Sequence, residues 1–387
     1  MPVQKGLTLV GLLSISFVVS IIYLFRGSHA GFGFENDDPN INWPVKEPGH
    51  EWTKHVVVAK MSYEDRFSSW LETGDLHGAI PKVYIADDPS APLSVPANKG
   101  HEAMVYLTYL IDHYDALPDV AVFMHAHQNS WHQDGLLEYD ALEMLKRLSP
   151  EAVTREGYRN LRCEWNPGCP AWIHPKAFQY ADSPRPEEPG VADAWAQLFP
   201  STPVPDIIAQ PCCGQFALSK QRMLSIPKAR YQVFRDWLLK TDLGDDISGR
   251  VFEYLWAYIF TAKPVFCPDM RKCYCDGYGV CFLDDKSFDH WFKLRWEWQQ
   301  LEKQLRDWKI VAAGKVSSDR AGTLPAAEIK ELEKTVPLTG LGQQLADEMN
   351  ELQRQMDEKR LAAIAAGDDP AVRAKVAGRK WKEGDGF

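Results

Sequence analysis

The chain has 387 residues and a formal net charge of −10 at pH 7, from 53 acidic and 43 basic side chains. This acidic balance argues against a nucleic-acid-binding protein, which needs a basic surface to neutralise phosphates. Hydrophobic residues make up 45% of the chain, and the length corresponds to one large α/β domain with appendages or to two or three domains.

The N-terminus contains an uncharged apolar run, LTLVGLLSISFVVSIIYLF, at residues 7–25. A helix of this length rises about 28 Å, close to the roughly 30 Å thickness of a membrane's hydrocarbon core. We therefore expect residues 1–26 to form a short tail and a transmembrane anchor in the lipid bilayer. A cleaved signal peptide is the alternative, because Ser28-His29-Ala30 resembles a cleavage site, although the apolar run is longer than usual for one.

The cysteines indicate which side of the membrane the domain occupies. The flanking charges do not, because Lys5 and Arg26 lie on opposite sides of the apolar run and nearly balance. Eight cysteines follow the run, an even number that favours disulfides in an oxidising compartment: Cys163, Cys169, Cys212, Cys213, Cys267, Cys273, Cys275 and Cys281. We expect a single-pass type II protein of the secretory pathway, in the Golgi or endoplasmic reticulum, with a lumenal C-terminal domain.

The cysteine spacing also favours disulfides over a zinc site. The run from Cys267 to Cys281 reads C-x5-C-x-C-x5-C, which lacks the CxxC pairs of zinc ribbons. Cys212 and Cys213 are adjacent and would be strained if they paired with each other, so we expect each to have a separate partner.

The chain after the anchor divides into a stem at 27–52, a globular α/β domain at 53–310 and a helical, partly flexible tail at 311–387. Three apolar runs are expected to be buried strands, and each is followed by a helical pattern: 55–59, 82–86 and 119–124, with helices at 64–71, 100–114 and 136–148. This alternation predicts a parallel sheet with right-handed crossovers, which binds ligands beyond the carboxyl ends of its strands.

The remainder of the domain is less regular. Residues 150–214 are rich in Pro, Gly and Trp and show no clear period, so we expect a long segment braced by disulfides. Further helices are expected at 216–224, 229–241, 249–260 and 290–310.

Histidines cluster at the end of the third predicted strand. Alternating residues of an extended chain point the same way, so His125 and His127 could reach one metal ion or one phosphate, with His132 close by. Gln128 and Trp131 lie in the same segment and are expected to bind substrate. The alternative is that these histidines only make local hydrogen bonds.

Polar residues near the second strand could bind a nucleotide. Asp87 ends that strand, where an acid either binds a ribose hydroxyl or forms a turn before Pro89. Asn98 and Lys99 directly precede a helix whose N-terminus would suit a diphosphate. An ordinary helix start is the alternative.

Carboxylates on two predicted helices are candidates for acid–base catalysis. Glu253 is the sole acid in the apolar stretch GRVFEYLWAYIF, and burial would raise its pKa toward that of a general base. An ion pair with Arg250 is the alternative. We assign Glu102 as a second catalytic carboxylate and Asp245 as a substrate-binding residue.

The run ANKGHEAMVYLTYLIDHYDALPDVAVFMHAH, followed by WH, resembles an uncharacterised fungal family known only as a domain of unknown function, over about residues 53–290. More loosely, the chain is similar to nucleotide-sugar glycosyltransferases of the GT-A type, which carry a D-x-D motif after a central strand. His125-Ala126-His127 stands in that place here. The likeness implies a GT-A-like domain, a sugar nucleotide and a glycan acceptor as substrates, and either Mn²⁺ or metal-independent catalysis.

The sequence therefore supports three hypotheses about function. The leading hypothesis is a membrane-anchored glycosyltransferase in which Glu253 is the base. The second is a metal-dependent hydrolase that uses His125, His127 and His132. The third is a non-catalytic lumenal protein that binds glycans or protein partners through its Trp-rich surface.

Overall fold

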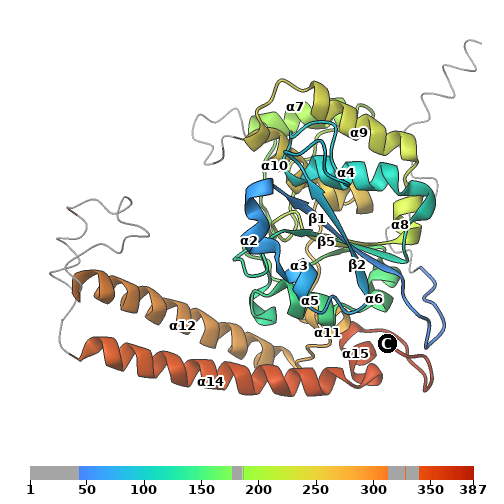
Figure 1. The fold of residues 1–387 in the computed structure, drawn as a ribbon. Coiled ribbons are helices and arrows are strands. Elements are labelled where there is room, and N and C mark those ends of the chain that lie inside the picture. Colours follow the sequence, from blue (N-terminus) through green and yellow to red (C-terminus); the bar gives the residue numbers. More distant parts are fainter. Residues whose placement is uncertain (1–42, 177–184, 186, 313–326, 328–339) are drawn as a thin grey trace, which may run out of the picture.

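The computed structural model describes residues 43–176, 185, 187–312, 327 and 340–387. Its centre is a five-stranded sheet in the order β2-β1-β3-β5-β4 (Figure 1). The strands are β1 (Lys54–Lys60), β2 (Ala79–Ile85), β3 (Val120–His125), β4 (Tyr158–Asn160) and β5 (Phe216–Ser219). β1 is parallel to β2 and β3, whereas β5 is antiparallel to β3 and β4. The fold is α/β as expected, but the sheet is mixed rather than wholly parallel.

Helices cover both faces of the sheet. Val57 belongs to the core on one face, and its neighbours Val56 and Val58 belong to the core on the other, as the alternation of a strand requires. Figure 1 shows one layer above the sheet and a second layer below it. The upper layer contains α4 (Glu102–Asp112), α7 (Glu188–Leu198), α9 (Lys228–Lys240) and α10 (Asp245–Thr261), and the lower contains α5 (Ala141–Arg147), α6 (Pro150–Glu156) and α11 (Met270–Tyr278).

Short helices fill several connections. The helix expected at 64–71 is divided into three pieces, and the one at 136–148 into a 3₁₀ turn and α5. The short elements are η1 (Ser62–Glu64), α2 (Asp65–Ser68), α3 (Trp70–Thr73), η2 (Tyr114–Ala116), η3 (Gly135–Leu137) and α8 (Lys220–Ser225). Trp70 of α3 donates a hydrogen bond to the carbonyl of Ala126 at 2.8 Å. The segment after β1 therefore supports the chain that leaves β3.

Two expectations in the middle of the chain are wrong. The segment expected to be irregular contains α6, β4 and α7. The helix expected at 216–224 begins as β5 and becomes helical only at Lys220. β5 lies between β3 and β4 with all four residues buried, so pairing on both edges overrides the local pattern of these residues.

All eight cysteines form disulfides. The pairs are Cys163–Cys273, Cys169–Cys267, Cys212–Cys213 and Cys275–Cys281. The expectation that Cys212 and Cys213 have separate partners is wrong. Positive φ angles of 88° at Cys213 and 62° at Gly214 form a turn in which the neighbouring cysteines join.

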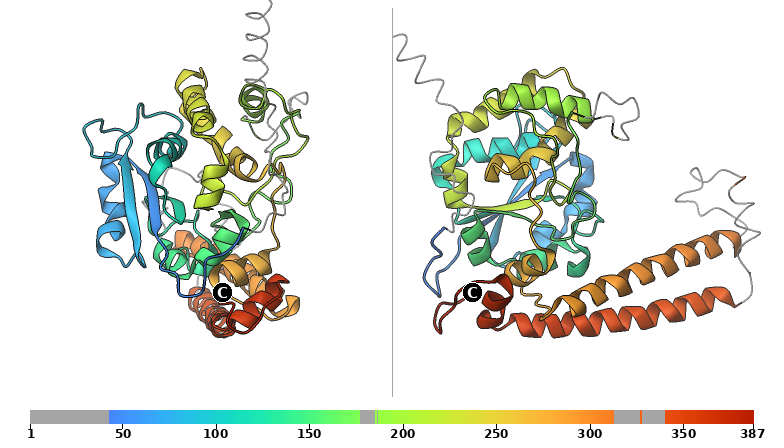
Figure 2. Two further views of the ribbon diagram at one scale, coloured as in Figure 1. Left: turned by 90° about the vertical axis from the view of Figure 1, so that its right-hand side faces the viewer. Right: turned by 180° about the vertical axis from the view of Figure 1, so that it is seen from behind.

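The C-terminal helices are docked on the domain at one end. α12 (Asp285–Ala312) and α14 (Leu341–Gly367) lie side by side and extend away from the body, and α15 (Pro370–Ala377) packs beside α11 (Figure 2). Arg360 of α14 donates to the carbonyl of Leu136 and to the carboxylate of Glu143, both at 3.0 Å. The tail is therefore part of the folded structure over residues 340–377.

The expected membrane anchor at 7–25 lies outside the described residues. Within the described ranges, no helix has both the length and the apolar character needed to cross a membrane.

The disulfides should contribute unequally to stability. Cys163–Cys273 closes a sequence separation of 110 residues, and Cys275–Cys281 closes one of 6. Each disulfide lowers the conformational entropy of the unfolded chain. By the chain-entropy relation, this stabilises the native state by roughly 5 kcal/mol for the first disulfide and roughly 2 kcal/mol for the second. We expect Cys163→Ala/Cys273→Ala to lower the free energy of unfolding in guanidinium more than Cys275→Ala/Cys281→Ala does. Equal losses from both pairs would contradict this account.

Candidate active site

A cleft opens at the carboxyl ends of the three parallel strands. Its larger cavity has a volume of about 460 Å³. The ends of β1, β2 and β3 contribute Lys60, Ala86 and His125, and the starts of α4 and α10 contribute Glu102 and Asp245. Other lining residues include Tyr63, Glu64, Asn98, His101, His127 and His132. Parallel strands place their carboxyl ends along one edge, so polar residues distant in sequence meet here.

A second cavity of about 250 Å³ adjoins the first. The two cavities share four lining residues: His101, Glu102, His125 and His132. The second cavity adds Cys213, Asp246, Arg250 and Glu253, which come from α10 and from the turn before β5. The candidate site therefore has two neighbouring compartments with a common wall.

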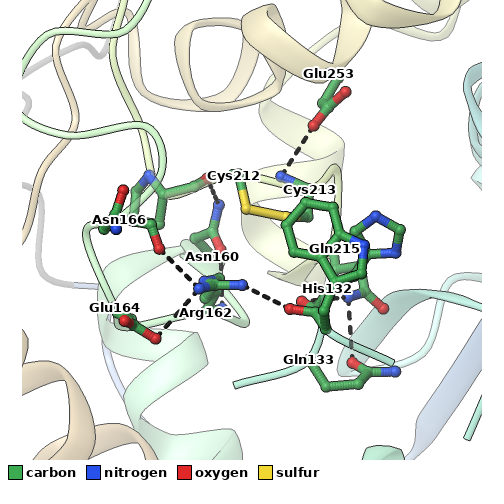
Figure 3. The surroundings of a disulfide bond; sticks show 12 residues. His132, Gln133, Asn160, Arg162, Glu164, Asn166, Cys212, Cys213, Gln215 and Glu253 are labelled. Carbon is green, nitrogen blue, oxygen red and sulfur yellow. Dashed lines mark hydrogen bonds and ion pairs between the residues drawn. A yellow bond between two sulfur atoms is a disulfide. The ribbon is translucent and has the colours of Figure 1, made fainter. Parts of the chain in front are cut away.

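The turn that carries the Cys212–Cys213 disulfide (Figure 3) contributes Cys213 to the lining of the smaller cavity. The backbone N–H of Cys213 donates to Glu253 Oε1 at 3.1 Å. The backbone carbonyl of Cys213 is 2.8 Å from His125 Nε2 and accepts a hydrogen bond from it. One residue therefore positions a carboxylate from α10 and an imidazole from β3.

Gly214 leaves room for a second carboxylate. A Cβ atom at this position would lie 2.8 Å from Glu102 Oε1 and 3.7 Å from Glu253 Cγ. Its φ of 62° also disfavours a side chain. The backbone of Gly214 thus lies close to both Glu102 and Glu253, in a conformation that favours glycine.

Burial raises the pKa of both carboxyl groups of this pair, and repulsion adds to the effect at Glu253. Burial, followed by repulsion from Glu102, raises the pKa of Glu253 to about 7. The pKa of Glu102 is also raised, mainly by burial. The alternative ion pair between Glu253 and Arg250 is not formed among the described contacts, where Arg250 lies 3.4 Å from Glu187. Glu253 can therefore exchange a proton near neutral pH.

Two histidines in the shared wall, His125 and His132, are weak bases. Burial is the main cause that lowers the pKa of His125. Burial, followed by repulsion from His125, lowers the pKa of His132 to about 4. Since a carbonyl only accepts, the hydrogen bond to Cys213 places a proton on Nε2 of His125 and leaves Nδ1 as the acceptor of a neutral ring.

Two buried glutamines hold the chain that follows β3. Gln215 accepts from the N–H of His125 at 3.0 Å and donates to the carbonyl of His132 at 3.1 Å. Gln133 donates to the carbonyl of His127 at 3.1 Å and accepts from Gln215 at 3.2 Å. Both side chains are at most 1% exposed, so this network fixes the backbone that carries all three histidines.

Seven of the eleven residues selected from the sequence line the cleft: Asn98, Glu102, His125, His127, His132, Asp245 and Glu253. The three histidines do not form a metal centre as they stand. Among the described residues, no group of three or more His, Cys, Asp and Glu side chains is placed to hold a metal ion. His127 instead lies 3.9 Å from Glu64 and packs against Phe67.

The other four selected residues do not line either cavity. Asp87 accepts hydrogen bonds from the backbone and hydroxyl of Ser62 at 2.8 and 2.7 Å, which lowers its pKa, so it braces a turn. Lys99 donates to the carbonyl of Thr241 at the end of α9.

Gln128 and Trp131 lie outside the cavities for different reasons. Gln128 donates to Asp140 at 3.2 Å and is used within its own loop. Trp131 is exposed at the edge of the cleft, where its ring packs on His132 with centroids 4.1 Å apart.

Sequence reasoning missed several lining or supporting residues. Glu64, His101 and Arg250 line the cleft, and Gln133 and Gln215 support it. His101 and Gln133 stand beside the selected residues Glu102 and His132 in the chain, and that adjacency was the one available signal. The role of Glu64 depends on a contact with His127, 63 residues later in the chain, and has no local signal.

Residues 56–276 match a family model described as a protein of unknown function (DUF3431). The chain belongs to this family. The match covers more than half of the chain and includes the whole candidate site, so the expected likeness to a domain of unknown function is confirmed for residues 56–276. No curated protein and no solved structure matches the chain.

The raised pKa of Glu253 predicts a pH-dependent stability of the DUF3431 domain. An acid whose pKa rises on folding binds more protons in the native state between about pH 4.5 and 7, so stability falls as pH rises through this window. We expect Glu253→Gln to match the wild type at pH 4 and to be more stable by about 1–3 kcal/mol at pH 8.

Denaturant unfolding at the two pH values measures this difference. Glutamine keeps an oxygen that can accept from Cys213, so the substitution removes the charge with little change of shape. Glu72→Gln, on the exposed side of α3, is the matched control. A stability difference that is the same at both pH values would contradict the raised pKa.

Proposed function

We propose that the cleft is the active site of a glycosyltransferase. The enzyme transfers the sugar of a nucleoside-diphosphate sugar to an acceptor hydroxyl. The supporting observation is the pair of adjoining cavities, which share Glu102 and His125, while only the smaller one contains Glu253. A group transfer brings two substrates together in neighbouring subsites, with the base on the acceptor side.

The larger cavity suits the donor. It lies over the ends of parallel strands, where open α/β sheets bind their ligands. β3 is the middle strand of the sheet, and His125-Ala126-His127 stands at its end. GT-A glycosyltransferases carry their D-x-D motif after a central strand, so this arrangement supports the finer assignment of a GT-A-like domain.

The donor cavity would need a cation to hold a diphosphate. Its charged lining includes Glu64, Glu102 and Asp245, and the ammonium of Lys60 is already ion-paired. These carboxylates would repel a diphosphate. Glu64 and His127, 3.9 Å apart, offer an oxygen and a nitrogen that suit Mn²⁺, with further ligands from the diphosphate. Bound Mn²⁺ would neutralise charge on the leaving diphosphate.

The smaller cavity suits the acceptor. An acceptor hydroxyl there gives its proton to Glu253 as its oxygen bonds to the anomeric carbon of the donor sugar. The bond between that carbon and the diphosphate breaks, and the diphosphate leaves with the bonding electrons. A carboxyl group with a pKa of about 7 is matched to this proton transfer near neutral pH.

The disulfides support the proposed location. Four disulfides indicate a domain in an oxidising compartment, outside the cytosol. We propose that residues 7–25 anchor this domain to a secretory-pathway membrane, of the Golgi or endoplasmic reticulum, with the domain on the lumenal side.

Replacing the base should separate transfer from donor binding. We expect Glu253→Gln to slow transfer by roughly 100-fold or more, because general-base catalysis contributes about that much. Donor affinity should be unchanged, because Glu253 does not line the donor cavity. The measurement is release of nucleoside diphosphate by the full-length protein from a panel of sugar nucleotides with Mn²⁺, beside calorimetric donor binding.

Glu72→Gln is the matched control, because Glu72 is an exposed acid of α3 that lines neither cavity. It should keep wild-type transfer. The proposal fails if no sugar nucleotide binds with or without Mn²⁺, or if Glu253→Gln transfers sugar at the wild-type rate.

A further inference from the structure

The vicinal disulfide is a feature of the site that the proposed function leaves unexplained. Cys212–Cys213 closes a sequence separation of 1 residue, so it restricts the unfolded chain least of the four disulfides. Its main effect is therefore on the local backbone. Among the described residues that line the two cavities, Cys213 is the one cysteine. The disulfide thus lies where a change of backbone conformation would alter the candidate site.

The chain on both sides of Cys213 is anchored to the rest of the domain. Before it, the backbone N–H of Cys212 donates to the carbonyl of Pro167 at 3.1 Å. After it, the backbone carbonyl of Gln215 accepts from the N–H of Leu161 at 3.0 Å. The disulfide closes a small ring that contains the peptide bond between the two cysteines. It therefore fixes how Cys213 is turned relative to the anchored Cys212.

Cys213 is held in a backbone conformation that a side chain disfavours. Its φ is 88°, a left-handed value that is uncommon for residues other than glycine. An open pair of thiols would allow Cys213 to return to a negative φ, which would rotate its N–H and its carbonyl. The N–H donates to Glu253 beside the disulfide (Figure 3), and the carbonyl accepts from His125. Both hydrogen bonds therefore depend on the closed ring.

We propose that the Cys212–Cys213 disulfide is a redox switch of the site, which positions Glu253 and His125 when it is closed and releases them when a dithiol reduces it. This inference rests on the proposed function for the reaction that the site performs, and it adds how that reaction is regulated. The two cysteines are positioning residues, because they act through the side chains that the Cys213 backbone orients.

The reductant is a small dithiol that enters the smaller cavity, whose volume of about 250 Å³ has room for it. One thiolate of the dithiol attacks the sulfur of Cys213, the S–S bond breaks, and the bonding electrons leave on the sulfur of Cys212. The second thiolate attacks the mixed disulfide and releases the thiolate of Cys213. Two electrons and two protons pass from the dithiol to the cysteine pair, and the dithiol becomes a cyclic disulfide.

The first measurement tests the switch without any assay of activity. The full-length protein is incubated with dithiothreitol, and alkylation followed by mass spectrometry identifies the thiols that have opened. The tautomer of His125 is then read from the NMR shifts of its ring nitrogens, assigned with His125→Gln. We expect Cys212 and Cys213 to open, and the ring of His125 to change from the Nε2-protonated tautomer to a mixture, because the carbonyl that selects it has turned away.

The second measurement is the release of nucleoside diphosphate from a panel of sugar nucleotides with Mn²⁺. We expect reduction to lower kcat by roughly tenfold or more, since small misplacements of a catalytic group have effects of this size. Reoxidation should restore the rate. Cys212→Ala/Cys213→Ala should have the low rate with and without dithiothreitol. Cys275→Ala/Cys281→Ala is the matched control, because this pair lines neither cavity of the cleft, and it should respond to dithiothreitol as the wild type does.

Unfolding in guanidinium checks that the reduced protein and both variants are folded, and the reduced wild type suffices for the test where a variant does not fold. A change of the His125 tautomer in a protein without transferase activity would support the switch and overturn the enzyme. An unchanged tautomer after Cys212–Cys213 has opened would overturn the switch, whether or not the protein transfers sugar. Opening of the other disulfides while Cys212–Cys213 stays closed would overturn it as well.

Discussion

The two hydrogen bonds of the Cys213 backbone are the constraint on which the candidate site depends. The N–H binds the carboxylate of Glu253 and the carbonyl binds the imidazole of His125, at 3.1 and 2.8 Å. These side chains come from α10 and β3, which lie on different parts of the fold. The N–H favours the charged form of the carboxylate, and the carbonyl selects the Nε2-protonated tautomer of the imidazole. One peptide segment therefore sets both the position and the protonation of two neighbouring groups.

The antiparallel side of the sheet braces this segment. The N–H of Cys212 donates to the carbonyl of Pro167 at 3.1 Å, and Asn160 of β4 donates to the carbonyl of Pro211 at 2.7 Å. The chain after β4 is joined to α11 by the disulfide of Cys163. Strands β4 and β5 thus hold the turn against the ends of the parallel strands. The antiparallel strands of the mixed sheet, which the sequence did not predict, therefore position the turn that contributes Cys213 to the smaller cavity.

The sequence predicted those parts of the fold whose signals are local. β1, β2 and β3 are continuous apolar runs between turn residues, and α9 and α10 have a clear helical period, so all five were located to within a few residues. β5 has only four residues, too few for its alternation to be told from a helix. Its state follows from pairing with β3 and β4, which no local pattern reveals.

For the site, the sequence predicted which residues come together but not where each side chain points. Strand ends and helix starts were expected to be polar and to meet, and Glu102, His125 and Glu253 do meet. The direction of each side chain was not predictable, because it depends on distant partners. Asp87 turns to Ser62, and Lys99 turns to the carbonyl that ends α9. The pairing of the two vicinal cysteines depends in the same way on a local backbone conformation.

The electrostatics of the site favour a functional origin over a structural one. Burial, followed by repulsion from Glu102, raises the pKa of Glu253, so this arrangement costs stability at neutral pH. A structural carboxylate would be paired with a cation, but the ion pair formed by Arg250 is with Glu187. Gly214 lies beside Glu102 with a φ of 62°, a backbone conformation that favours glycine and is strained for other residues. A fold selected for stability alone would replace the two carboxylates with apolar residues of similar volume. Their presence beside an open cavity is the pattern expected of groups that exchange protons with a ligand.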